Sequence, residues 1–261
     1  MPIQTIEPRR LYRQIADQLR LLIEAGEFRE GARLPPERDL ALKLGVSRPS
    51  VREALIALEV EGWVEVRMGS GIYVKRSTER AGQDSLVAES PLETIRARQM
   101  IEGELAAEAA RLGAPGLGAP GSGAPGSGAS GAVAGLRDAV ALMQDEADSG
   151  NVPIRGDRLF HVRVAEMAHN SVLVRVVGEL FDERHNPISM KLGDYFENPA
   201  SWAAAITEHR RVIDAIARGD ANAARDAMRH HLSCSHDRLT ANWAAPDGVL
   251  AASGRAAAES S

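Results

Sequence analysis

The spacing of apolar residues changes once along this chain, near Gly62, and that change limits the fold more than any other feature. Before Gly62 the apolar residues recur every three or four positions, as in Leu11–Ala25, which is typical of amphipathic helices. From Trp63 to Val74 they alternate around the tip Met68-Gly69-Ser70-Gly71, which predicts a β-hairpin. The sequence therefore predicts a small helical unit that ends in a two-stranded sheet.

Two of the expected helices follow each other across a turn of two or three residues. Pro36 can begin the first of them, because a proline in the first turn costs no hydrogen bond, and Gly45 provides a left-handed end. Ser47 is a good N-cap for the next helix, which continues to Gly62. Together with the helix at 11–25, this arrangement predicts three helices plus a β-hairpin wing, the winged helix-turn-helix fold.

The rest of the chain shows helical spacing and no convincing strand pattern after residue 75. Its many alanines favour helices. We therefore predict a mainly α protein, in which the winged helix-turn-helix is followed by an all-α helical bundle. The helices expected in this second part lie at 92–111, 132–148, 154–168, 172–183, 202–218 and 221–241.

Composition predicts the domain boundaries. Residues 77–90 lack any period and predict a linker between one domain at 1–76 and another at 91–242. Within the second domain, 113–131 is a Gly/Pro/Ser-rich near-repeat with eight glycines and three prolines. It predicts a flexible surface loop, with a docking segment as the alternative. Residues 243–261 are expected to form a flexible tail.

Charge and cysteine content restrict the compartment and the partners. The net charge is −5, but residues 1–76 carry +2 and the remainder −7, which indicates that the two parts have different partners. Cys234 is the only cysteine, which excludes an intrachain disulfide and fits a reducing compartment. We find no pattern of a secretory signal or a membrane span, so we expect a cytoplasmic protein with no membrane partner.

Basic and small polar residues gather at the start of the expected third helix. In a helix-turn-helix this helix enters the major groove of DNA with its N-terminus first, and arginine can read guanine or bridge a phosphate. The glycines of the hairpin tip allow a close approach to a minor groove. The alternative is that the arginines are ordinary solvated positions. The candidate DNA-binding residues are Arg38, Ser47, Arg48, Ser50, Arg52 and Gly69.

Three histidines and one carboxylate could converge in the second part. Asp157 and His161 are four residues apart, so a helix projects both from one face. His209 lies ten residues before Gly219 and His231 twelve after it, so a helical hairpin that turns there brings both imidazoles to one level. One interpretation is a cation site with open positions for a ligand. The other is a set of unrelated surface histidines, because four further histidines offer accidental pairings.

Three motifs within residues 9–75, LPPERDLA, GVSRPSVREAL and VEVRMGSGIYV, resemble the winged-helix domain of GntR-type bacterial transcription regulators. The resemblance implies that Arg38, Arg48, Arg52 and Gly69 occupy DNA-contacting positions. It also implies a homodimer that binds an inverted repeat in double-stranded operator DNA. Pro49 stands where other members often have threonine, and the first turn of a helix accepts proline.

PLETIRARQMIEGELAAEAA and the pattern D-x-x-F-H followed by Asn resemble the all-helical, metal-binding FCD domain of the FadR-type branch of these regulators. The resemblance extends over about 90–242. It implies a divalent metal ion, such as Zn, Ni or Mn, held by Asp157, His161, His209 and His231. The Gly-rich segment at 113–131 departs from the family pattern but falls in a loop.

RARQMIEGELA, DRLFHVRVAEMAHNSVL and ERHNPISMKLGDYF are similar to repressors of hexuronate-utilisation operons. This similarity implies a small carboxylate effector, because a hexuronate offers a carboxylate and hydroxyls to a metal and an arginine. The candidate effector-binding residues are Arg98, Arg184, His185 and Asn186. In the alternative interpretation Arg98 pairs with Glu102, while Arg184 and Asn186 cap a helix.

These expectations describe a ligand-responsive repressor and not an enzyme. A dimer holds two recognition helices on operator half-sites, and a sugar acid bound at the metal changes their relative placement. The alternatives are a metal-dependent enzyme, or a regulator of another carboxylic acid, an acyl ligand or the metal itself. The absence of a recognisable base or nucleophile motif near the three histidines counts against an enzyme.

Overall fold

The computed structural model describes residues 10–76, 88–113 and 127–241. They form two compact units, whose boundary falls between Leu86 and Val87, within the segment 77–90. The mainly α fold class is confirmed, because helices dominate and the described strands form a single two-stranded antiparallel sheet.

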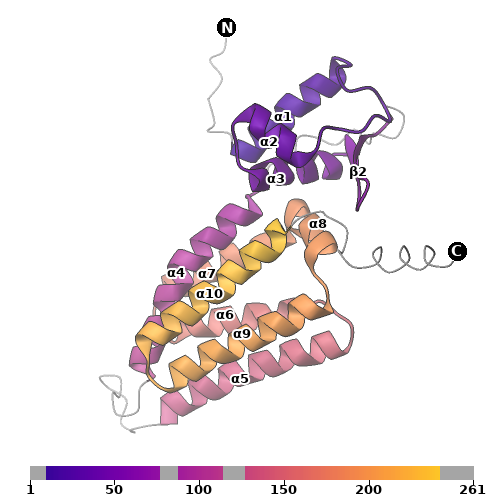
Figure 1. Cartoon of the computed structure of the whole chain (residues 1–261). Coiled ribbons are helices and arrows are strands. Elements are labelled where there is room, and N and C mark those ends of the chain that lie inside the picture. The colour runs from indigo at the N-terminus through magenta and orange to yellow at the C-terminus, as the bar shows by residue number, and fades with distance from the viewer. Residues whose placement is uncertain (1–9, 77–87, 114–126, 242–261) are drawn as a thin grey trace, which may run out of the picture. The chain divides into compact units, whose positions relative to one another are not determined.

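The N-terminal unit contains three helices in the predicted places (Figure 1). Gly45 ends the second helix with a φ of 67°, and Ser47 caps the third by accepting a hydrogen bond from the Ser50 amide at 3.2 Å. The turn between these two helices is therefore as short as predicted. The helices are α1 (Leu11–Glu24), α2 (Glu37–Leu44) and α3 (Arg48–Val60).

A β-hairpin follows α3 and forms the wing. Strands β1 (Val64–Arg67) and β2 (Gly71–Val74) are antiparallel, with Val64 opposite Val74. The valines and Ile72 face the core of the unit, whereas the alternate residues face outward, as the period of two requires. The predicted winged helix-turn-helix is confirmed.

The described part of the C-terminal unit is entirely helical (Figure 1). Polar residues cap several of its helices: Ser90, Asn170, Asn186 and Asn198 each accept a hydrogen bond from a backbone amide of the first turn. The elements are α4 (Pro91–Leu112), α5 (Ser127–Asp148), α6 (Ile154–Glu166), α7 (Ser171–Asp182), the 3-10 turn η2 (Glu183–His185), α8 (Pro187–Phe196), α9 (Pro199–Ala217) and α10 (Ala221–Thr240).

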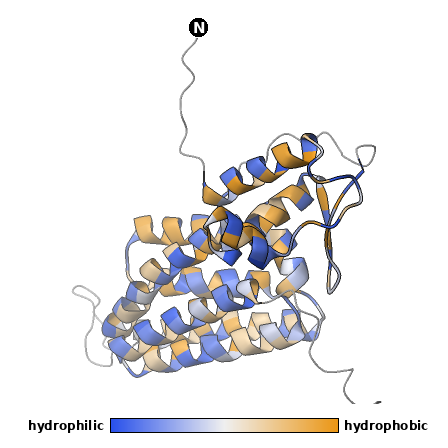
Figure 2. Ribbon diagram, turned by 45° about the horizontal axis from the view of Figure 1, so that its top comes forward, coloured by the Kyte–Doolittle hydropathy of each residue, from blue (hydrophilic) through white to orange (hydrophobic). Residues whose placement is uncertain are grey.

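These helices pack side by side around one apolar core. α10 lies against α4 and α9, while α5 lies against α6 and α9. Figure 2 shows apolar and polar residues alternating along the helices, so that each helix can bury one face. The largest fully buried side chains of this core include Leu136, Met143, Phe160, Ile206 and Ile216.

Two differences from the sequence-based expectation concern one additional helix and one helix boundary. α8 was not expected, because its ten residues follow α7 and the 3-10 turn without a loop that separates them clearly. α5 begins at Ser127, so residues 127–131 of the predicted loop 113–131 are helical. Residues 114–126, most of the predicted linker and the predicted tail at 243–261 lie outside the described residues.

No helix within the described residues is both long enough and apolar enough to cross a membrane.

Gly156 allows α6 to approach the backbone of α5 closely, one residue before Asp157. A Cβ atom at Gly156 would lie 2.5 Å from the Met143 amide nitrogen and 2.9 Å from the Ala139 carbonyl oxygen. Backbone atoms inside a helix cannot move aside without shifting the helix. The close crossing of α5 and α6 therefore helps to set the position of the α6 side chains that follow Gly156.

Replacing Gly156 with alanine is expected to destabilise the protein. Overpacking in a tight core costs typically about 1–3 kcal/mol, which exceeds the roughly 1 kcal/mol by which alanine favours a helix over glycine. Urea unfolding of the full chain, followed by circular dichroism, should show a lower free energy of unfolding for Gly156→Ala.

Gly131→Ala is the matched control, since Gly131 also lies in a helix and a Cβ there would meet no atom within 4 Å. We expect this control to be as stable as the unmodified protein or slightly more stable. Equal stability of Gly156→Ala and the unmodified protein would show that the α5–α6 crossing is not tight.

Candidate metal and effector site

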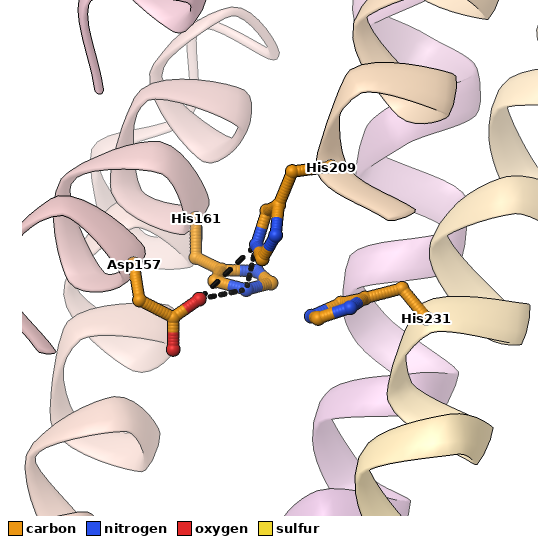
Figure 3. Close-up of side chains that lie close together, drawn as sticks. All are labelled: Asp157, His161, His209 and His231. Atoms are coloured by element: carbon orange, nitrogen blue, oxygen red, sulfur yellow. Dashed lines mark hydrogen bonds and ion pairs between the residues drawn. The ribbon is translucent and has the colours of Figure 1, made fainter. Parts of the chain in front are cut away.

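Four buried side chains from three helices meet inside the C-terminal unit (Figure 3). Asp157 and His161 come from α6, His209 from α9 and His231 from α10. Each offers one ligand atom, and these four atoms lie within 4.8 Å of one another. The structure therefore brings together all four residues of the predicted metal site.

The atoms at the centre of this cluster lie close enough to share a proton or a bound cation. His161 Nε2 and His209 Nε2 are 3.2 Å apart, and Asp157 Oδ1 lies 3.4 Å and 3.1 Å from them, respectively. Asp157 Oδ1 is also buried without a hydrogen-bond partner of acceptable geometry. A buried carboxylate oxygen in this state is costly, and a cation would compensate for it.

The other nitrogen of each imidazole is already engaged by an acceptor. His161 Nδ1 donates to the Glu102 carboxylate, His209 Nδ1 donates to the Ala205 carbonyl at 2.7 Å, and His231 Nδ1 lies 2.9 Å from Glu208 Oε2. A proton held at Nδ1 leaves Nε2 with a free lone pair. Acceptors of this kind orient histidine ligands around metal ions in proteins.

Each of the two glutamates is in turn held by an arginine. Arg98 Nε donates to Glu102 at 2.6 Å, and Arg238 donates to both oxygens of Glu208, at 2.9 and 3.1 Å. Sequence reasoning missed Glu102 as a partner of a ligand and missed Glu208 and Arg238 entirely. The available signals were the position of Glu208 next to His209, and the seven-residue spacing from His231 to Arg238 on one helix.

The directions of the pKa shifts favour a neutral His231 and an ionised Asp157. Burial lowers the pKa of His231 to about 3, and the neighbouring His209 adds to this shift. Burial also opposes charge on His161, but the Glu102 carboxylate raises the pKa of this imidazole. Burial disfavours the charged form of Asp157 too, yet the two nearby imidazoles lower its pKa well below the usual range. The site thus keeps its carboxylates ionised and attracts positive charge.

A cavity of about 390 Å³ reaches the cluster from one side, and both Asp157 and His231 form part of its wall. The remaining wall draws on every helix of the unit, although α5 contributes only Met143 and α7 only Leu180. Ligands at the open side of a cation held here would enter through this cavity. Three arginines also line it, Arg98, Arg184 and Arg238.

Three of the four predicted effector residues line this cavity. Arg98 is buried and pairs with Glu102, as the alternative interpretation required, but its Nη2 has no hydrogen-bond partner among the described residues. Arg184 bridges Asp157 Oδ2 at 2.9 Å and Glu197 at 2.6 Å, and His185 adjoins it on the wall.

Asn186 is not part of the cavity wall. Its side chain caps α8 by accepting from the Ser189 amide at 2.9 Å, and it donates to the Glu89 carbonyl at 3.2 Å. The capping alternative therefore describes the Asn186 side chain in this structure, and its role toward an effector stays a prediction. The cap belongs to α8, a helix that was not expected from the sequence.

The predicted DNA-binding residues lie at the start of α3, on α2 and at the wing tip. Arg38 is exposed on α2, and Gly69 has a φ of 73° at the tip of the hairpin. The Arg48 side chain is half exposed. The Arg52 side chain is buried and donates a hydrogen bond to the Glu37 carboxylate at 2.9 Å. Ser47 and Ser50 share a hydrogen bond of 2.8 Å at the N-terminus of α3.

Two family descriptions match the two units. Residues 11–74 match "Bacterial regulatory proteins, gntR family", and residues 124–233 match the FCD domain. Among solved structures, the chain is similar to Streptococcus agalactiae GntR, with 24% identity, a TM-score of 0.43 and coverage of 86% of this chain and 98% of that one.

Bacterial regulators match nearly the whole chain. The Uxu operon transcriptional regulator of Escherichia coli is 33% identical over 88% of this chain and 87% of the relative. The Exu regulon transcriptional regulator of Escherichia coli is 35% identical over 88% of this chain and 84% of the relative. A putative L-lactate dehydrogenase operon regulatory protein of Escherichia coli is 31% identical over 89% and 87%.

The family and these relatives are transcription regulators and not enzymes, so the alternative of a metal-dependent enzyme is dropped. The N-terminal unit is accordingly a DNA-binding domain and the C-terminal unit a domain that binds a small-molecule effector. The chain belongs to the GntR family of bacterial transcription regulators and carries an FCD domain as its C-terminal unit.

Proposed function

We propose that this protein represses a catabolic operon for hexuronates or related aldonates, and that a carboxylated sugar acid bound beside a divalent metal ion releases it from DNA. The observation that supports this most is the arginine-lined cavity that ends on Asp157 and His231. The Uxu operon and Exu regulon relatives support the choice of a sugar acid.

The donor set suits a divalent transition metal. Three imidazoles and one carboxylate are ligands that Zn, Ni and Mn accept, and the paired Nδ1 atoms leave all three Nε2 atoms available. Asp157, His161, His209 and His231 would hold the ion. When bound, it supplies a Lewis acid that attracts the oxygens of a carboxylate or hydroxyl.

The charges around the site suit an effector with one carboxylate. Three arginines of the wall are each bonded to one glutamate, the pairs being Arg98–Glu102, Arg184–Glu197 and Arg238–Glu208. These pairs cancel in charge, so a divalent cation exceeds the charge of Asp157, its one carboxylate ligand, by one, while Glu183 and Asp194 add negative charge elsewhere on the wall. A monocarboxylate neutralises this excess at the cation, and its hydroxyls find a cavity of about 390 Å³ with polar wall residues.

In this proposal two copies of the chain place their α3 helices on the half-sites of an inverted repeat. The effector acts by binding one arrangement of the dimer better than the other, since a ligand shifts an equilibrium only by its difference in affinity. Arg38, Arg48, Arg52 and Gly69 are the proposed contacts to DNA.

The first prediction concerns DNA. Arg48→Ala should weaken binding to a duplex selected from a random library with the unmodified protein, because a charged contact at the start of the recognition helix is lost. A loss of about 1–3 kcal/mol, roughly tenfold in affinity or more, is expected in fluorescence anisotropy at fixed salt. Arg175→Ala is the control, since Arg175 is an exposed arginine of α7 that pairs with Glu179. Equal affinity of both variants would argue against the assigned role of Arg48.

The second prediction concerns the metal. A protein with both His209→Ala and His231→Ala should lose its bound metal, because two of four ligands are gone. Elemental analysis of purified protein measures the metal content, and circular dichroism checks that the helices remain. His230→Ala serves as the control, because His230 is an exposed neighbour on α10. Full metal content in the double variant would rule out this site.

The third prediction concerns the effector. Arg98→Lys keeps the charge beside Glu102 but loses the planar fork that binds a carboxylate through two hydrogen bonds. The affinity for D-glucuronate or D-galacturonate should fall about tenfold or more in calorimetry, an effect of the size expected for a charged hydrogen bond. Arg96→Lys is the control, because Arg96 is exposed on α4 and lies outside the cavity wall.

The same titration distinguishes the two classes of acid named by the relatives. Binding of L-lactate with no response to either uronate would overturn the proposed sugar-acid effector and favour a short hydroxy acid. Unchanged uronate affinity in Arg98→Lys would show that Arg98 does not bind the effector.

A further inference from the structure

Arg238 of the FCD domain lines the cavity and also supports a proposed metal ligand. It lies in the last turn of α10, where it lines the cavity together with Ser235 and Leu239. Its guanidinium also binds both oxygens of Glu208, at 2.9 and 3.1 Å, and Glu208 accepts the hydrogen bond from His231 Nδ1. One side chain therefore contacts the cavity and is linked by two hydrogen bonds to the imidazole of a proposed metal ligand.

The guanidinium retains a donor for a second partner. Its two Nη atoms make the bonds to Glu208 and a bond of 3.0 Å to Ser235 Oγ. Among the described residues, Nε of Arg238 has no hydrogen-bond partner, and the side chain keeps 24% of its surface exposed. An arginine has five N–H groups in one plane, so it can hold Glu208 and an anion in the cavity at the same time.

Arg98 differs from Arg238 in accessibility. Arg98 is linked to His161 through Glu102 by hydrogen bonds of the same kind. Its side chain, however, is almost fully buried and packs over the Phe181 ring, 4.8 Å from the ring centre. Arg238 is therefore the more exposed of the two arginines that support a histidine ligand through a glutamate.

We propose that Arg238 binds an anionic or hydroxyl oxygen of the effector and, through Glu208 and His231, makes effector binding and metal binding strengthen each other. This inference rests on the proposed function and adds to it a residue and a direction of coupling. An oxygen bound at Nε fixes the guanidinium against Glu208, which in turn holds His231 with Nε2 toward the cluster. Because coupling between two ligands is reciprocal, the metal must raise effector affinity by the same factor.

The test measures metal affinity with and without the acid. Zn²⁺ is titrated against a competing chelator in the full-length protein, first alone and then with saturating D-galacturonate or D-glucuronate. In the unmodified protein we expect the acid to tighten Zn²⁺ binding by about fivefold or more, the usual lower end of such coupling.

Arg238→Lys is the decisive variant, because lysine keeps the charge but cannot hold both oxygens of Glu208 and a third oxygen in one plane. We expect Zn²⁺ affinity without acid to fall roughly tenfold, as for other partners of metal ligands, and the effect of the acid to shrink to the part that comes from its direct contact with the cation. Arg225→Lys is the matched control. Arg225 lies on α10, as Arg238 does, and binds both oxygens of Glu104 away from the cavity.

A second variant covers the case in which Arg238→Lys folds poorly. Glu208→Gln keeps an acceptor for His231 but removes the charge that Arg238 binds. It should lower Zn²⁺ affinity and weaken the coupling as Arg238→Lys does, while circular dichroism shows an unchanged helix content.

The possible results separate this inference from the proposed function. Unchanged Zn²⁺ affinity in Arg238→Lys, or full coupling in either variant, would overturn the role of Arg238 and leave the regulator intact. Failure of the unmodified protein to bind Zn²⁺, Ni²⁺ or Mn²⁺ would overturn the metal site itself. Binding of the metal with no effect of any acid would reject both the coupling and the proposed class of effector.

Discussion

The C-terminal unit depends on the hydrogen bonds made by the Nδ1 atoms of three buried histidines. Glu102, Ala205 and Glu208 accept these bonds from histidines on three different helices, and each bond leaves an Nε2 lone pair available. The Nε2 atoms of His161 and His209 lie 3.4 and 3.1 Å from Asp157 Oδ1. Without such acceptors the imidazoles could rotate or exchange tautomers, and the cluster would lose its donor set. The packing of α4, α6, α9 and α10 around Phe160 keeps the acceptors in place.

Three arginines support the proposed metal ligands and also border the cavity. Arg184 binds the Asp157 ligand directly, whereas Arg98 and Arg238 act through glutamates, and all three line one cavity. A carboxylate that enters the cavity therefore meets residues that already control the ligands of the proposed cation. This shared use of arginine gives the domain a physical means to couple a metabolite to the metal, and to any change in helix packing that accompanies it.

The winged helix-turn-helix could be predicted from sequence because its signals are local. Apolar spacing, Gly45, Ser47 and the glycines of the tip each act within a few residues, and the structure shows them in the expected roles. The four residues of the proposed metal site could also be named from the sequence, but only the resemblance to the family distinguished them from other histidines. α8 was missed because ten residues between two helices carry too little periodicity, so the capping role of Asn186 at its start was only an alternative.

What the sequence determined by itself is the order of helices, the hairpin and the types of side chain available to each helix face, because these depend on neighbours along the chain. Tertiary structure alone decided which glutamate accepts from which histidine and which arginines border the cavity. Glu208 and Arg238 are thirty residues apart and meet only because α9 and α10 pack against each other. Such pairings depend on the rotation and depth of packed helices, which the sequence does not display as a local pattern.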